Sequence, residues 1–89
     1  MRERDIRKAL KARVESYGGE IRAVSWLGRR NAPDVLCGLP AMPGASRGVH
    51  VFVETKRPGK DATEAQAREH SRMRSWGCEV KVITTLEEL

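Results

Sequence analysis

The sequence lacks any run of apolar residues long enough to cross a bilayer, which takes roughly 20 residues. Its beginning also differs from a secretory signal, because basic residues interrupt the apolar positions there, at Arg2, Arg4, Arg7 and Lys8. We therefore expect a cytoplasmic protein with no membrane partner.

Cysteine is scarce as well. Cys37 and Cys78 are the two cysteines of the chain; they stand far apart, and each has apolar neighbours. The sequence has no Cys-x-x-Cys pair and no Cys/His cluster, which argues against a zinc site. We expect both residues to be packed, reduced thiols in a reducing compartment.

Acidic residues are outnumbered by basic ones. The chain carries 17 Lys and Arg against 12 Asp and Glu, a net charge of +5. Such a balance favours anionic partners, nucleic acid ahead of a membrane surface, although many small basic domains have neither. The length of 89 residues predicts one small domain over 1–89 with a modest core, which favours a homodimer.

Hydrophobic periodicity predicts six elements. The spacing of Ile6, Leu10, Val14 and Tyr17 predicts a helix over 3–17, ended by two glycines. Further patterns predict strands over 20–27, 33–37 and 49–56, a helix over 63–76, a strand over 78–83 and a terminal turn over 85–89. This α-β-β-β-α-β order predicts an α/β fold with a central mixed sheet flanked by helices, with the strands on either side of the second helix parallel.

The stretch HVFVETKRPGK, residues 50–60, ends a predicted strand with an acid and a base. Alternate residues of a strand face the same side, so Glu54 and Lys56 share one face and Thr55 takes the other. Asp34 stands at the start of a neighbouring predicted strand. If the two strands pair through the Gly/Pro-rich loop 38–48, Asp34 lies beside Glu54.

Two adjacent carboxylates repel each other, and a hard divalent cation such as Mg²⁺ or Mn²⁺ relieves that repulsion. A lysine beside the metal can position water or offset charge on a phosphate. An acid-x-lysine strand end is usually a solvated pair, and Pro-Asp alone is an ordinary turn signal. Their joint occurrence on adjacent predicted strands of a basic chain favours phosphodiester cleavage.

The segments APD and VETK, a hairpin-sized gap apart, resemble the PD-(D/E)xK nuclease superfamily. The chain is most similar to its VRR-NUC branch, the viral-type replication and repair nucleases, in the phage-like stand-alone form. The similarity extends over nearly the whole chain: GG after the first helix, GRRNAPDVL, HVFVETKRPG and EAQAREHSRMRSWGCEVKVI. The family often has glycine where Asn31 stands.

This resemblance implies a restriction-endonuclease-like fold and a Mg²⁺-dependent endodeoxyribonuclease, with Mn²⁺ as a substitute and no organic cofactor. The implied catalytic residues are Asp34, Glu54, Lys56, Glu3 and Gln66. The implied metal ligands are Asp34, Glu54, Glu3 and the Thr55 carbonyl. By family analogy the substrate is DNA, with branched or four-way junction DNA as a candidate, in a bacterial cell or a phage-infected host.

Several alternatives stay open at this stage. Glu15 is the alternative to Glu3 as the acid of the first helix, and a solvated helix surface explains either. Gln66 also fits a capping box with Thr63, which is a structural role. A rival to the nuclease is a non-cleaving nucleic-acid-binding module that keeps the same fold.

The remaining candidates are basic, aromatic or histidine side chains. Position relative to the acid/base motif selects four residues for phosphate contact, Arg29, Arg30, Arg57 and Lys60. His70 is expected to be a half-exposed helix residue, with an approach to DNA or a metal as the alternative. Trp26 and Trp76 are expected in the core or a dimer face, with stacking on bases as the alternative.

Overall fold

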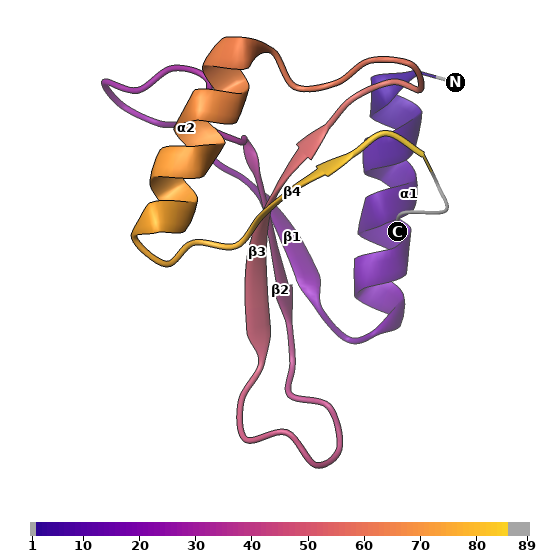
Figure 1. The fold of residues 1–89 in the computed structure, drawn as a ribbon. Coiled ribbons are helices and arrows are strands. Elements are labelled where there is room, and N and C mark those ends of the chain that lie inside the picture. Colours follow the sequence, from indigo (N-terminus) through magenta and orange to yellow (C-terminus); the bar gives the residue numbers. More distant parts are fainter. Residues whose placement is uncertain (1, 86–89) are drawn as a thin grey trace.

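The computed structural model describes residues 2–85 and contains six regular elements (Figure 1). In chain order they are α1 (Glu3–Ser16), β1 (Glu20–Ala23), β2 (Val35–Leu39), β3 (Val49–Thr55), α2 (Glu64–Ser75) and β4 (Val80–Ile83). This is the predicted α-β-β-β-α-β order. None of the helices among these residues is both long enough and apolar enough to cross a membrane.

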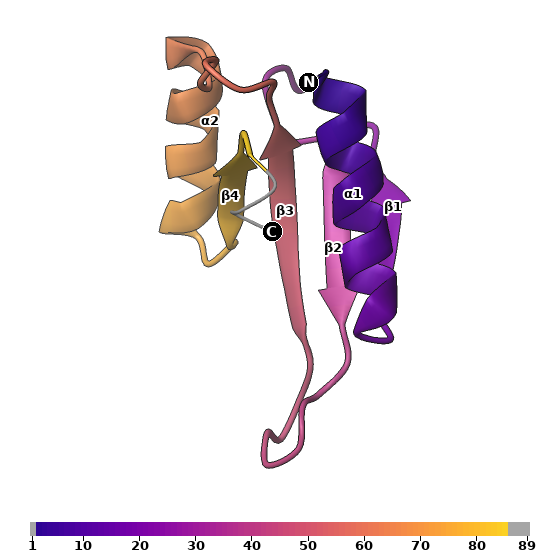
Figure 2. The same cartoon turned by 90° about the vertical axis from the view of Figure 1, so that its right-hand side faces the viewer.

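The four strands form one mixed sheet in the order β1-β2-β3-β4. The pairs β1–β2 and β2–β3 are antiparallel, whereas β3 and β4 are parallel and connected through α2. The helices lie on opposite faces of the sheet (Figures 1 and 2). The predicted α/β class and mixed sheet are therefore confirmed.

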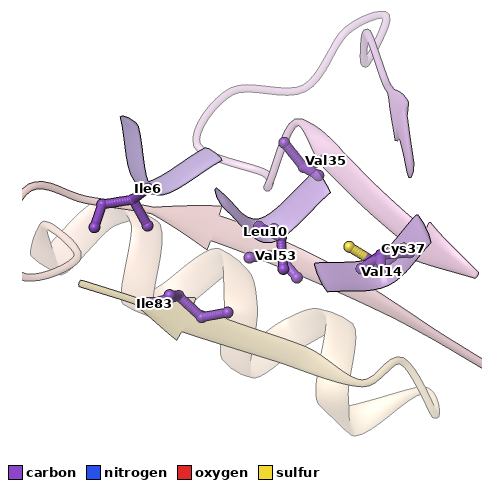
Figure 3. Close-up of a cluster of buried hydrophobic side chains, with 7 residues drawn as sticks. All are labelled: Ile6, Leu10, Val14, Val35, Cys37, Val53 and Ile83. Carbon is purple, nitrogen blue, oxygen red and sulfur yellow. The ribbon is translucent and has the colours of Figure 1, made fainter. Parts of the chain in front are cut away.

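The hydrophobic core lies between α1 and the sheet (Figure 3). Helix α1 contributes residues spaced four apart, which places them on one face: Ile6, Leu10 and Val14. The strands contribute alternate residues that face α1, together with one from β4: Val35, Cys37, Val53 and Ile83. Burial raises the pKa of the Cys37 thiol, which makes this cysteine a packing residue of low reactivity, as expected.

The Gly18-Gly19 pair that follows α1 is required for two different reasons. Gly18 has a φ of +81°, a conformation that side chains rarely adopt. At Gly19 a Cβ would stand 2.2 Å from the carbonyl oxygen of Gly38, so a side chain there would push β1 away from β2. The two glycines turn the chain directly from α1 into the sheet.

Helix α2 begins with a capping box. The Gln66 amide nitrogen donates to Thr63 Oγ1 at 3.1 Å, and the Thr63 amide donates back to Gln66 Oε1 at 2.9 Å. The residues that α2 buries are Glu69, His70 and Met73. The sheet face under α2 is therefore more polar than the face under α1.

Two strands differ most from the predictions. The predicted strand 20–27 ends at Ala23, because Trp26 turns away and donates its indole N–H to the Pro33 carbonyl at 2.7 Å. The predicted strand 33–37 runs instead over Val35–Leu39. Pro33 has no N–H for a sheet hydrogen bond, so pairing starts after it. Most of the predicted turn 85–89 lies outside the described residues.

Candidate active site

The start of β2 and the end of β3 place the two acids of the motif next to each other. The antiparallel register pairs Val35 with Val53, so Asp34, one residue before Val35, stands opposite Glu54, one residue after Val53. The Asp34 carbonyl accepts a hydrogen bond from the Val24 amide at 2.9 Å, which holds this segment against the chain leaving β1. The expected pairing of the two strands through the long loop is thus present.

Glu54 is buried at the end of β3, with 7% of its surface exposed. Its Oε1 atom has no hydrogen-bond partner within the described residues. Burial is the main cause that raises the pKa of Glu54; the Lys56 charge lowers the pKa, and the charges of Asp34 and Glu3 raise it further. In this position the ionised form of the Glu54 carboxyl group is unfavourable relative to the neutral form unless a cation binds to it.

Arg7 contacts two acids of the site, Glu3 and Asp34, from the α1 side. Its Nη2 atom lies 3.3 Å from Asp34 Oδ1 and 3.7 Å from Glu3 Oε1. The same atom is 3.4 Å from Thr55 Oγ1, and Thr55 Oγ1 is 3.4 Å from Glu3 Oε1. Glu3 therefore reaches the end of β3 from the first turn of α1, whereas Glu15 lies in the last turn of that helix.

Across residues 2–85, no three carboxylate, imidazole or thiol groups come together as a set that could hold a metal as they stand. The donor types nevertheless fit a hard divalent cation, since Asp34, Glu3 and Glu54 all supply carboxylate oxygens. Two of these acids share the Arg7 guanidinium, and the third presents the unpartnered Glu54 Oε1. The site has the negative charge that such a cation neutralises.

Lys56 and Gln66 differ in how closely they relate to these acids. Lys56 follows directly after the end of β3, and its backbone amide donates to the Ile83 carbonyl at 2.9 Å. Its charge lowers the pKa of Glu54. The Gln66 side-chain oxygen is used in the capping box with Thr63. The capping role of Gln66 is thus observed, and its catalytic role stays a prediction.

His70 is more buried than expected, with 1% of its surface exposed. Its Nε2 atom lies 3.5 Å from Glu54 Oε1 and has no hydrogen-bond partner among the described residues. Burial, followed by the Arg74 charge, lowers the pKa of His70. Since burial shifts both groups toward their neutral forms, this contact is no fixed ion pair. The sequence offered a weak signal for it, one helical turn between Gln66 and His70.

The four basic residues predicted to contact phosphate fall into two groups. Arg29 forms a two-pronged contact with the buried Glu69 carboxylate, its Nη2 atom at 2.7 Å from Oε1 and its Nε atom at 3.1 Å from Oε2. Arg30, Arg57 and Lys60 are exposed. The Arg29 guanidinium thus connects the loop before Asp34 to α2. The side chains of Arg30, Arg57 and Lys60 remain accessible to a phosphate.

Glu69 is the partner of two arginines. Arg72 also contacts it, with Nη2 at 2.8 Å from Oε1. The hydrogen bond from Arg29 is the main cause that lowers the pKa of Glu69 to about 2, and Arg72 lowers it further. Two of the buried carboxylates of the α2 face, Glu54 and Glu69, therefore have pKa values shifted in opposite directions.

Comparisons with known proteins agree with this fold. No protein-family model matches the chain. The chain is 39% identical over 83 residues to the "Putative nuclease p44" of Acyrthosiphon pisum secondary endosymbiont phage 1, covering 93% of this chain and 83% of that protein. A solved structure described as a VRR_NUC domain superposes with a TM-score of 0.78 at 36% identity, over 97% of this chain and 87% of the other. With this relative, this fold and the Asp34, Glu54 and Lys56 motif in place, the chain belongs to the VRR-NUC family of nucleases.

Proposed function

We propose that the chain is a metal-dependent endonuclease that hydrolyses DNA phosphodiester bonds. The observation that supports this proposal is the buried Glu54 carboxylate, whose Oε1 has no hydrogen-bond partner among the described residues and whose pKa is raised by burial and by the charges of Asp34 and Glu3. Keeping such a group ionised is costly without a cation, so the site is suited to binding one.

Asp34, Glu54, Glu3 and the Thr55 carbonyl would hold Mg²⁺ or, as a substitute, Mn²⁺. When bound, such an ion polarises the scissile phosphate and lowers the pKa of a water molecule. Lys56 donates hydrogen bonds from its ammonium group to orient the attacking water and to offset charge on the phosphate. Arg7 contacts both Asp34 and Glu3, so a bound cation would compete with its guanidinium for these two carboxylates.

The intact set of Asp34, Glu54 and Lys56 favours cleavage over the alternative of a non-cleaving binding module. Incubation of the purified chain with labelled duplex, flap, single-stranded and four-way DNA tests both readings. We expect cleavage with Mg²⁺ or Mn²⁺, and DNA binding without turnover in Ca²⁺, whose coordination is longer and looser. Undiminished cleavage in excess EDTA would contradict the metal site, and binding without cleavage under every metal would favour the binding module.

Junction specificity is a finer part of the proposal and depends on a homodimer. Loop 40–48 lies at the opposite end of β3 from the active site and extends beyond the sheet (Figures 1 and 2). Met42 in this loop and Val49 at the start of β3 are 55% and 53% exposed. Contact between two such loops would bury these apolar side chains and hold two active sites at a fixed distance.

Light scattering tests the homodimer directly. A dimer has twice the 10.0 kDa mass of the chain. Met42→Ser together with Val49→Ser is expected to return the protein to that mass and to uncouple paired cuts in four-way DNA. A monomer that still makes paired cuts would contradict the dimer proposal and leave the active site standing.

A further inference from the structure

A groove of about 340 Å³ runs between α1 and the edge strand β1. Five of the side chains that line it are basic: Arg4, Arg7, Lys8, Lys11 and Arg22. Helix α1 and β1 lie alongside each other in Figure 2, with the beginning of α1 close to the end of β3. The groove therefore leads along α1 to the active site.

Four of the basic residues of α1 line the groove and share one side of the helix. Arg4, Lys8 and Lys11 follow each other at intervals of four and three residues, which places them in a row. From Arg4 to Lys11 the row spans about 10 Å at 1.5 Å per residue. Phosphates of one DNA strand are about 3.4 Å apart along the duplex axis and further apart along the strand itself, so the row is long enough to contact more than one phosphate.

The charges of the groove are largely uncompensated by the protein. Arg22 contacts Glu20 at 2.5 Å, and Arg7 contacts Asp34 and Glu3. Within residues 2–85, Arg4, Lys8 and Lys11 form no ion pair. The Nε atom of Arg7 is buried and also lacks a hydrogen-bond partner there. An anionic ligand in the groove would neutralise Arg4, Lys8 and Lys11.

The floor of the groove is apolar, formed by Ile21, Ala23 and Val35. A rim of cations above an apolar floor suits a nucleic-acid strand, because phosphates reach the rim while sugars or bases contact the floor. Arg7 lines the groove and also contacts Asp34, so it joins the two sites. A strand in the groove would continue to the acids at the end of β3.

We propose that the α1–β1 groove binds the phosphate backbone of the DNA strand next to the scissile phosphate, through Arg4, Lys8 and Lys11. This inference rests on the proposed endonuclease function and adds a strand-binding site to it. The contacts are electrostatic and independent of base sequence, so they set affinity and register on the DNA.

A triple variant with Arg4, Lys8 and Lys11 each changed to Gln tests the site. Its matched control changes Arg13, Arg68 and Lys81 to Gln, three exposed basic residues outside the groove. Fluorescence anisotropy with labelled duplex DNA in EDTA gives affinity as a function of salt. We expect the groove variant to bind about tenfold or more weakly, and its salt dependence to fall by about 2 to 3 in log–log slope. Equal slopes and affinities for the groove variant and the control would overturn the inference.

A second variant, Ala23→Glu, places a negative charge on the groove floor without removing a basic residue. It is expected to weaken DNA binding, with a circular dichroism spectrum like that of the wild type. Unchanged DNA affinity together with a changed mass in light scattering would overturn the inference in favour of edge-to-edge pairing of β1 with a second copy.

Hydrolysis of bis(p-nitrophenyl) phosphate separates this inference from the proposed function. This small diester reports on the active site without needing the groove, so the groove variant is expected to hydrolyse it at the wild-type rate. A wild-type chain that binds DNA through the groove and hydrolyses neither substrate would refute the endonuclease and leave the groove as a binding site. Equal loss of both activities in the groove variant would assign its residues to the fold or the active site and overturn the strand-binding role.

Discussion

The two faces of the sheet are built in different ways. Under α1, seven buried residues form a cluster in which every side chain is apolar or a thiol. Under α2, the buried residues include Glu54, Glu69 and His70. Of these, Glu69 is held by two arginines, whereas Glu54 Oε1 and His70 Nε2 have no hydrogen-bond partner among the described residues.

The comparison shows where stability and function reside. Apolar burial under α1 stabilises the fold by about 25 cal/mol for each Å² removed from water. Each unsatisfied buried polar atom near α2 costs roughly 1 to 3 kcal/mol. We infer that apolar burial under α1 stabilises the fold enough to hold the charged groups at the end of β3, which would be unfavourable without it.

The largest effect is expected at Glu54. Glu54→Gln should lower DNA cleavage on the order of a thousandfold, because it removes a charge at the centre of the site. Thermal unfolding should show an unchanged or higher melting temperature, since a neutral amide is cheaper to bury than the carboxylate. Wild-type cleavage in this variant would contradict the metal-site assignment, and a strongly lowered melting temperature would contradict the cost ascribed to the buried charge.

Leu10→Ala probes the α1 face. Deleting a buried leucine typically costs about 2 to 5 kcal/mol. Urea unfolding should show this loss as a lower midpoint at an unchanged slope. The neighbouring exposed residue provides the control, since Lys11→Ala should change stability by no more than about 0.5 kcal/mol. Equal midpoints for the two variants would remove the distinction between the faces.

Glu3 and Glu15 test whether α1 also contributes to the site. Glu3→Gln should reduce cleavage by about 10- to 100-fold, because Glu3 lies near Thr55, Arg7 and the charge of Glu54. Glu15→Gln should leave the rate nearly unchanged, since Glu15 is in the last turn of the same helix. The reverse ranking in a cleavage assay would move the helix acid to Glu15.

The smallest effect concerns acid stability. The pKa of Glu69 is lowered from 4.5 to about 2 in the folded protein. Its ionisation therefore contributes to the stability of the fold fully above pH 4.5, and this contribution is lost as the pH falls toward 2. Glu69→Gln should therefore flatten the loss of stability over this range. Glu54 has a raised pKa, so it favours the folded state in its protonated form. This contribution to stability is present at low pH and is lost as the pH rises above 4.5.

Melting temperatures as a function of pH for Glu69→Gln and Glu54→Gln test this opposition. Relative to the wild type, the first variant should lose stability above pH 4.5, and the second should gain it. Parallel curves for the wild type and both variants would show that neither carboxylate is coupled to folding.

Local patterns in the sequence determined much of this protein. The four-residue spacing in α1 fixes its buried face, and alternation along β3 separates Val53 from Glu54. The capping box of α2 and the glycine pair after α1 are also readable, because each depends on neighbours within a few residues. The proximity of Asp34 and Glu54 followed from pairing two strands that a single loop connects.

Tertiary structure decided the contacts between elements far apart in the chain. Three such contacts join separate elements: His70 is buried against Glu54, Arg29 forms an ion pair with Glu69, and Arg7 lies between Glu3 and Asp34. The early end of β1 likewise depends on the Trp26 indole reaching the Pro33 carbonyl. Periodicity shows which side of its own helix or strand a residue occupies. The residue that it meets there depends on how the helices and strands pack together.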